Sequence, residues 1–482
     1  MDDLRLTIVQ KGVVDFITLG CSKNLVDAER VMRQLEVAGW HCVHDAEDPQ
    51  GEVCVINTCG FIGDAKEESI NMILQMAERK KRGQLKKLIV MGCLSERYRA
   101  ELEEELPEVD AYYGKFDFME MIGYLGTSAA ASSKNVLPRT HAFGFPTPER
   151  MFLPEAQRLS ECCKSYERKL TTPRHYAYLK ISEGCNRMCS YCAIPLITGR
   201  HTSRPMEEIL EEVKWLVGQG VKEFNVIAQD LSSYGLDLYK GERLKVKGER
   251  VHLLPELIDK MAEIEGVEWI RLHYAYPTDF PEGILEVMAK HDNVCKYMDI
   301  ALQHCTDHML GLMRRHITRA EQDALIRKIR EKVPGICIRT TLLVGHPGET
   351  EEDFEALKTW VKEMRFERMG CFAYSDEEGT YANKHYKDDI PQEVKDRRVE
   401  ELMAIQQEIS RELMEQKVGT VQRVIIDRKE GDYWIGRTQF DSPEVDCEIL
   451  IENIGDLSLV IGDFYDVKVT KAEEFDLYGE IV

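Results

Sequence analysis

The sequence predicts a three-part α/β protein: a small N-terminal parallel βαβ sheet domain, a central parallel (β/α) barrel, complete or partial, and a C-terminal five-stranded antiparallel β-barrel. Apolar runs alternate with helical patterns over residues 1–125, and a second alternation begins at His175. Short strands then recur at about ten-residue spacing over 419–482. We expect domains at 1–126, 173–390 and 419–482, with a linker at 127–172 and a connecting helix at 391–418.

The composition is that of a folded multidomain chain. Its 482 residues are 43% apolar and 31% charged, which suffices to bury the cores of two or three domains. No apolar run approaches the roughly 18 residues of a membrane span, and Asp2, Asp3 and Arg5 interrupt any secretory signal. We therefore expect a cytoplasmic protein with no membrane partner, whose 15 cysteines are reduced thiols available for metal or redox chemistry.

Three predicted strands of the first domain end in cysteines beside glycines. The apolar runs cover 13–19, 53–57 and 88–91, with helices around 28–35 and 64–82 between them. The strands lead into Cys21, Cys59 and Cys93. Because parallel strands present their carboxyl ends at one edge, we expect the three thiols to gather there. Spacings of 38 and 34 residues do not define a metal site by themselves, so buried structural thiols remain the alternative.

Six further apolar runs predict the strands of the central barrel, near 176–181, 223–228, 267–274, 297–302, 338–344 and 369–374. A helix is expected from Pro205 to Val217, because proline suits the first turn of a helix. The five strands of the C-terminal barrel are predicted near 420–426, 433–438, 447–451, 463–469 and 477–481.

This last segment carries −9 of the net charge of −22, because its 15 Asp and Glu face only 6 Lys and Arg. Such a barrel repels phosphate backbones and favours a basic partner. A merely solvated acidic face is the alternative.

The most specific motif is the C-x3-C-x2-C arrangement of Cys185, Cys189 and Cys192, which follows a predicted strand. Three thiolates can hold three irons of a cubane cluster and leave the fourth iron open to a cofactor or substrate. A structural zinc site normally uses four protein ligands. Zinc binding and chance clustering of cysteines remain the alternatives.

This motif, with Tyr191 before its last cysteine, resembles that of the radical S-adenosylmethionine (SAM) superfamily, and residues 345–349 resemble that superfamily's glycine-containing SAM element. The resemblance implies a partial (β/α) barrel, a [4Fe-4S] cluster on the three cysteines, and SAM on its open iron. It also implies SAM contacts at Tyr191, Gln229, Gly345 and Glu349. Tyr191 as a core residue and 345–349 as a simple turn remain alternatives.

The N-terminal motifs at 20–24, 57–62 and 92–94 extend the resemblance to the methylthiotransferase family over nearly the whole chain, including a TRAM-like C-terminal barrel. The resemblance implies that Cys21, Cys59 and Cys93 hold a second [4Fe-4S] cluster that carries the donated sulfur. It implies no catalytic side chain beyond the cluster ligands. Radical chemistry suits the family's target, because side-chain acids and bases do not activate a saturated C–H bond.

One branch of this family modifies adenosine in tRNA and another modifies an aspartate of small-subunit ribosomal protein S12. The acidic barrel and the segments 228–230, 302–304 and 436–446 favour the S12 branch. We therefore expect protein S12 or the small ribosomal subunit as partner, and an external reductant such as a flavodoxin, and we do not expect tRNA. The tRNA-modifying enzyme and a non-catalytic iron–sulfur carrier or scaffold are the alternatives.

The sequence departs from the commoner family pattern at a charged insertion in 237–252, at Cys305 and at the order of residues 198–204. The remaining eight cysteines are expected to be small apolar residues: Cys42, Cys54, Cys162, Cys163, Cys295, Cys337, Cys371 and Cys447.

Overall fold

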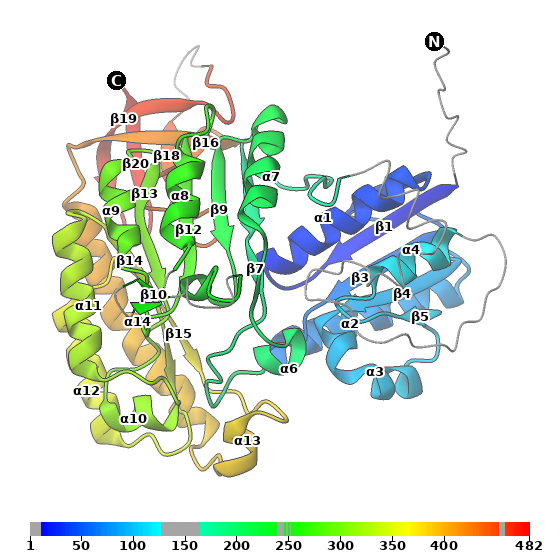
Figure 1. Cartoon of the computed structure of the whole chain (residues 1–482), viewed down its shortest axis with the longest axis horizontal. Coiled ribbons are helices and arrows are strands. Elements are labelled where there is room, and N and C mark those ends of the chain that lie inside the picture. The colour runs from blue at the N-terminus through cyan, green and yellow to red at the C-terminus, as the bar shows by residue number, and fades with distance from the viewer. Residues whose placement is uncertain (1–10, 127–163, 239–244, 247–248, 251, 453–457) are drawn as a thin grey trace. The chain divides into compact units, whose positions relative to one another are not determined.

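The computed structural model describes residues 11–126, 164–238, 245–246, 249–250, 252–452 and 458–482 (Figure 1). The chain forms two compact units. The first contains the chain up to Thr171 together with Glu183–Cys185 and Ala193–Arg204. The second contains Thr172–Ser182, Asn186–Cys192 and Pro205–Val482. None of the described helices combines the length and apolar character needed to cross a bilayer.

The first unit is built on a five-stranded parallel sheet of order β2-β1-β3-β4-β5. Its strands are β1 (Gly12–Thr18), β2 (Trp40–His44), β3 (Val53–Thr58), β4 (Lys87–Gly92) and β5 (Ala111–Tyr112). The predicted parallel βαβ sheet is confirmed. The two outer strands were missed, because β2 buries only Cys42 and β5 has only two residues.

Helices cover both faces of this sheet (Figure 1). They are α1 (Ser22–Val37), α2 (Gly63–Lys81), α3 (Cys93–Glu105) and α4 (Phe118–Gly126). Apolar residues of α1 and α4 share a core with one strand face, and those of α2 and α3 share a core with the other. This is the arrangement expected of strands that are apolar on both sides. Consequently β1, β3 and β4 each lead within a few residues into a helix.

The predicted linker lies mostly outside the described residues, but its end packs on α1. Arg168 forms a buried ion pair of 2.6 Å with Glu29, and the backbone N–H of Thr171 donates to the same carboxylate at 2.8 Å. The first unit also holds α6 (Ile194–Thr198) and β8 (Thr202–Ser203), whereas β7 (Ser182–Glu183) joins the two units in sequence.

The second unit contains an open six-stranded parallel sheet of order β15-β14-β13-β12-β9-β6. The strands are β6 (Tyr176–Lys180), β9 (Glu223–Ile227), β12 (Trp269–Ala275), β13 (Val294–Ile300), β14 (Cys337–Val344) and β15 (Arg368–Ala373). All six predicted strands are found, and the sheet remains open, so the barrel is partial.

The connections between these strands carry helices, as right-handed parallel crossovers require. They are α7 (Met206–Gly218), α8 (Leu254–Ala262), α9 (Gly283–Lys290), α10 (Asp307–Leu312), α11 (Arg319–Lys332) and α12 (Glu351–Met364), with the short η2 (Leu231–Ser233), β10 (Lys245–Val246) and β11 (Glu249–Arg250). Capping boxes at Thr318 and Thr350 begin α11 and α12. After β15 come α13 (Tyr381–His385) and the long α14 (Gln392–Glu415).

The C-terminal segment forms a closed barrel of order β16-β17-β18-β20-β19. Its strands are β16 (Val421–Glu430), β17 (Tyr433–Thr438), β18 (Ile449–Glu452), β19 (Phe464–Ala472) and β20 (Leu477–Ile481). The expectation of a wholly antiparallel barrel was wrong at one seam, because β18 and β20 pair in parallel. Directions cannot alternate all the way round a ring with an odd number of strands, so closure requires one parallel pair.

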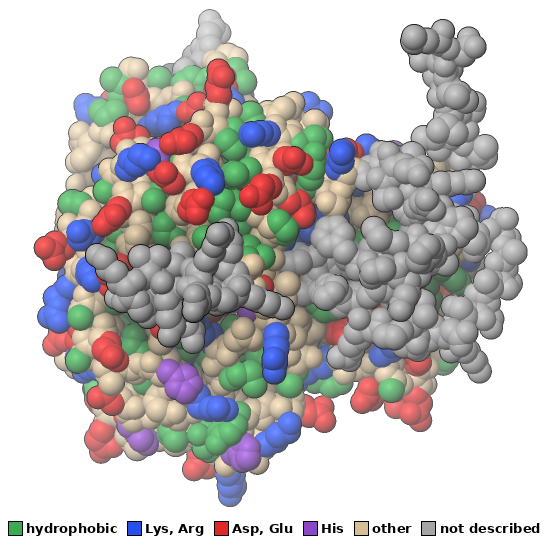
Figure 2. Space-filling view, viewed as in Figure 1, with side chains coloured by type: hydrophobic (Ala, Val, Ile, Leu, Met, Phe, Trp, Pro, Cys, Tyr) green, Lys and Arg blue, Asp and Glu red, His purple; other side chains and the backbone are tan. Residues whose placement is uncertain are grey.

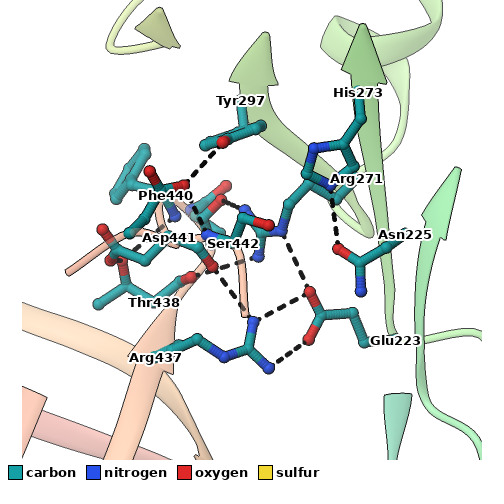
Figure 3. A network of polar contacts seen from close by, with 12 residues as sticks. Glu223, Asn225, Arg271, His273, Tyr297, Arg437, Thr438, Phe440, Asp441 and Ser442 are labelled. Atoms are coloured by element: carbon teal, nitrogen blue, oxygen red, sulfur yellow. Dashed lines mark hydrogen bonds and ion pairs between the residues drawn. The ribbon is translucent and has the colours of Figure 1, made fainter. Parts of the chain in front are cut away.

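A buried ionic network fastens this barrel to the sheet of the same unit (Figure 3). The Glu223 carboxylate, at the start of β9, accepts from Arg271 of β12 at 3.1 Å and from Arg437 of β17 at 2.7 Å. All three side chains are at most 2% exposed. Arg437 also pairs with Asp427 at 2.6 Å, and Arg271 donates to the Gln439 carbonyl at 2.6 Å. The barrel therefore packs on the amino-terminal ends of the strands.

Replacing Glu223 should test this network. Burial opposes ionisation, but Arg437 and Arg271 outweigh it and lower the pKa of the carboxyl. Glu223→Gln leaves two buried guanidiniums without their shared charge, so we expect a loss of about 3–5 kcal/mol in the free energy of unfolding at neutral pH. A lowered folded-state pKa stabilises the protein fully above the unfolded-state pKa, and this stabilisation is lost as the pH falls through the folded-state value. The difference from wild type should therefore shrink as the pH falls below about 4.

Urea unfolding between about pH 2.5 and pH 8 measures both effects. The control is Glu473→Gln, which removes an exposed partner of Lys471 and should leave stability unchanged. A loss below about 1 kcal/mol for Glu223→Gln would contradict the proposed importance of the network.

Candidate active site

The thiols of the first unit lie where three adjacent parallel strands end. Cys21 follows β1 and caps α1, Cys59 follows β3, and Cys93 is the first residue of α3 after β4. Since β1 pairs with β3 and β3 with β4, the predicted placement at one sheet edge is confirmed. Their role as cluster ligands remains a prediction.

Asn24, in the N-terminal motif at 20–24, links these strand ends by hydrogen bonds. Its side-chain amide donates to the carbonyls of Leu19 and Thr58, both at 3.1 Å. Its carbonyl oxygen accepts from the Cys93 thiol at 3.4 Å. Asn57, at the end of β3, donates to the Asn24 backbone carbonyl at 2.8 Å. The conformation of the strand ends is thus fixed by buried hydrogen bonds and not by the thiols alone.

The glycines beside the cysteines permit a close approach of backbone and thiol. A Cβ at Gly20, whose φ is +92°, would lie 2.7 Å from the Cys59 Cβ. A Cβ at Gly60 would lie 2.8 Å from the Cys93 carbonyl carbon. Neither position has room for a side chain, so glycine is required for the three thiols to approach one another.

The electrostatics of this edge favour thiolates that have a positive partner. Burial raises the pKa of Cys93 to about 12 and also raises the pKa of Cys59, while the nearby Lys115 ammonium lowers both. Cys21 and Cys93 stand at helix N-termini, where the helix dipole favours negative charge. Buried thiols of raised pKa ionise readily when they bind iron, so three such donors fit a cluster.

Within the described residues, no three His, Cys, Asp or Glu side chains gather as closely as a single metal ion requires. A cubane cluster has a different requirement, because each thiolate binds a different iron.

The cysteines of the second motif are divided between the units. Cys185 belongs to the first unit, where its N–H donates to the Gly199 carbonyl at 3.2 Å. Cys189 and Cys192 belong to the second unit, and the Cys192 N–H donates to the Cys189 carbonyl at 3.2 Å. Arg187, which lies between Cys185 and Cys189 in the motif, pairs with Asp230 after β9 at 2.6 Å. This ion pair brings the predicted segment 228–230 to the motif.

A buried arginine that the sequence analysis missed contacts the second motif. Arg315 is 2% exposed, and its guanidinium donates to the Cys189 sulfur at 3.3 Å and to the Tyr191 hydroxyl at 3.4 Å. It also lies over the Tyr276 ring at 4.0 Å. No carboxylate pairs with Arg315 among the residues that the structure describes.

A buried cation without a counter-charge is costly. Arg315 therefore fits a site that receives negative charge from thiolates, a cluster or a carboxylate-bearing cofactor. In the sequence, nothing distinguished it from its neighbour Arg314, which lies over Tyr381 instead.

The glycine-containing element at 345–349 lies directly against the cysteine motif. Ser190 and His346 are 2.9 Å apart, side chain to side chain. Burial lowers the pKa of His346 to about 4, so the ring is neutral at pH 7. Its Nδ1–H donates to the Pro347 carbonyl at 3.0 Å, which leaves Nε2 to accept from the Ser190 hydroxyl.

The four predicted SAM contacts occupy different environments. Tyr191 lies beside Arg315, and Gln229 follows β9 and is half-buried. Gly345 has φ +73° and donates its N–H to the Glu349 carboxylate. That carboxylate is fully buried and also binds Arg398 at 2.6 Å and His304 at 3.2 Å. Glu349 thus holds the turn together, and contact of these four residues with SAM remains a prediction.

Of the eight cysteines expected to be small apolar residues, Cys162 and Cys163 lie outside the described residues. The other six are buried, as predicted: Cys42, Cys54, Cys295, Cys337, Cys371 and Cys447.

Three segments of the chain match known families. Residues 13–114 match the uncharacterized protein family UPF0004, residues 179–361 match the radical SAM superfamily, and residues 418–482 match the TRAM domain. Among solved structures, the radical SAM methyltransferase TsrM from Kitasatospora setae superposes with a TM-score of 0.52 at 14% identity. The match covers 87% of this chain and 79% of that one, and it shows a shared fold. The protein is thus a member of the radical SAM superfamily.

Full-length relatives define the family more narrowly. Ribosomal protein uS12 methylthiotransferase RimO of Phocaeicola vulgatus is 58% identical over 98% of this chain and 100% of its own length. The proteins of that name from Porphyromonas gingivalis and Christiangramia forsetii are 54% and 47% identical, over 98% and 99% of this chain and 100% and 96% of their own lengths. The chain belongs to the family of ribosomal protein uS12 methylthiotransferases.

The close approach at Gly20 gives a test of the N-terminal site. Gly20→Ala would push its Cβ into Cys59, so we expect reconstituted protein to lose about half of its iron. Gly83→Ala is the matched control, because Gly83 has a similar φ of +75° with nothing within 4 Å of a new Cβ. Both variants incur the backbone cost of a positive φ, so only the steric clash differs. Equal iron contents in the two variants would contradict the need for a close approach between Gly20 and Cys59.

Proposed function

We propose that the protein is a radical SAM enzyme that methylthiolates the β-carbon of an aspartate in ribosomal protein uS12. The observation that carries the proposal is the presence, in one chain, of a thiol triad at the ends of β1, β3 and β4 and a second cysteine motif beside buried Arg315. The full-length identity to proteins named for this reaction supports the substrate.

The residues fit two [4Fe-4S] clusters and SAM. Cys185, Cys189 and Cys192 would hold the SAM-binding cluster, and the N-terminal triad would hold the second. When bound, these groups supply a carbon-centred radical that removes hydrogen from an unactivated C–H bond, a sulfur atom, and a methyl group for that sulfur.

The protein's own contribution is charge compensation and positioning. Arg315 places a permanent positive charge 3.3 Å from the Cys189 sulfur, where it would compensate the negative charge of a bound cluster. The Ser190–His346 hydrogen bond fixes the cysteine loop against the 345–349 turn, and Glu349 fixes that turn against Arg398 of α14. Because these groups are buried, the loop is held in place before cofactor and substrate arrive.

The C-terminal barrel is the proposed docking element for the basic ribosomal client. Its charge is less available than its composition indicates, since Asp427, Asp441 and Asp446 pair internally with Arg437, Arg368 and Arg339. On the face shown in Figure 2, the described Asp and Glu side chains are interspersed with Lys and Arg. The remaining acidic groups still favour a basic protein over tRNA. Protein uS12, free or in the small subunit, would be modified in the cytoplasm with electrons from a reductant such as a flavodoxin.

Iron content and SAM cleavage test the two-cluster arrangement. Anaerobically reconstituted wild type should hold about eight irons per chain, four in each cubane. The variant with Cys21, Cys59 and Cys93 all changed to Ala should hold about four, cleave SAM and transfer no sulfur. Cys54→Ala is the control, because Cys54 is buried within β3 and should leave both clusters intact. Eight irons in the triple variant would exclude the N-terminal cluster, and absence of SAM cleavage by wild type would favour an iron–sulfur carrier.

The substrate is tested by mass spectrometry of uS12 and tRNA from a deletion strain. We expect the methylthio group to be missing from the aspartate of uS12 and to return with a plasmid copy. Its loss from tRNA alone would replace uS12 with a tRNA substrate.

A further inference from the structure

The N-terminal thiols have a buried lysine beside them that the proposed chemistry does not yet use. The Lys115 side chain is 4% exposed, and its ammonium forms ion pairs with Asp27 at 3.0 Å and Glu183 at 3.6 Å. It interacts electrostatically with Cys93 and Cys21, and it lowers the pKa of Cys59 as well. All of these residues belong to the first unit.

The position of Lys115 is fixed by the elements that carry the candidate ligands. Asp27 lies on α1, which Cys21 caps. The backbone N–H of Lys115 donates to the Glu96 carboxylate at 3.1 Å, and Glu96 is in the first turn of α3, which Cys93 begins. Glu183 precedes Cys185 by two residues. Lys115 is therefore held by three segments, each of which also carries a predicted cluster ligand.

The charge on Lys115 is permanent under physiological conditions. Burial alone would favour the neutral amine, but Asp27 and Glu183 outweigh this effect and raise the pKa well above its usual value. A buried ammonium is expensive unless it interacts with negative charge. Its two carboxylates hold it in place, and its electrostatic contact with the thiols gives it a further anionic neighbour when they bind iron as thiolates.

We propose that Lys115 is a positioning residue that supplies the fixed positive charge for the N-terminal sulfur-donating centre and stabilises its most anionic form. The inference rests on the proposed function, because it requires the second cluster. A nearby positive charge favours the reduced cluster over the oxidised one and favours binding of a hydrosulfide anion at an open iron. Lys115 therefore raises the reduction potential of this cluster and its affinity for the sulfur to be donated.

The test uses the full chain with Cys185, Cys189 and Cys192 changed to Ala, so that only the N-terminal cluster is present. In this background, Lys115→Met should retain iron but shift the midpoint potential to more negative values in an EPR-monitored titration. Affinity for added sodium sulfide should fall by about tenfold or more. Lys115→Arg should restore both values toward those of the parent protein. Lys169→Met is the control, since Lys169 is another lysine of the first unit and pairs with Glu36 at 2.6 Å.

A second variant keeps the test decisive if Lys115→Met loses its iron. Glu183→Gln removes a negative charge from the same group, so it should shift the potential in the positive direction. An unchanged potential and sulfide affinity in iron-loaded Lys115→Met, or an unchanged potential in Glu183→Gln, would overturn the inference. Absence of iron from the parent variant is a different result, because it would remove the second cluster and with it the proposed function.

Discussion

Buried positive charge beside cysteine sulfur is the interaction on which both candidate sites depend. Arg315 has no carboxylate partner in the described chain and contacts Cys189, while Lys115 is held by two carboxylates close to the N-terminal thiols. Burial raises the pKa of Cys59 and Cys93, and the Lys115 ammonium offsets part of this cost of forming thiolates. Glycines and short strand-to-helix turns allow a close approach of backbone and cysteine at the ends of the strands.

Most of the fold is predictable from the sequence, because the central strands of the parallel sheets are apolar on both faces. β1, β3 and β4, all six strands of the open sheet and all five strands of the closed barrel were found within a few residues. β2 and β5 were missed because they are short or weakly apolar at the sheet edge. The parallel β18–β20 seam was missed because strand direction depends on ring closure, which a local pattern does not contain.

The candidate site was predictable only where spacing is informative. The three cysteines of the C-x3-C-x2-C motif are close in sequence, so their spacing alone indicates a site. The N-terminal cysteines are far apart in sequence, and their placement at one edge follows only once the sheet is known to be parallel. Arg315 and Lys115 were not predictable, because each is a single basic residue whose importance comes from contacts far along the chain. For the barrel, the sequence overstated the acidic charge that is available to a partner. Its summed charge includes acidic groups such as Asp441, which forms a buried ion pair with Arg368.

The attachment of the barrel through Glu223, Arg271 and Arg437 has a consequence for evolution and for engineering. Partners of the barrel lie on strands of the catalytic sheet, so the two modules are not freely interchangeable. A chimaera that received a barrel from another enzyme would also need matching residues on β9 and β12, or it would bury unmatched guanidinium groups. The barrel and the sheet on which it packs are therefore expected to be inherited together.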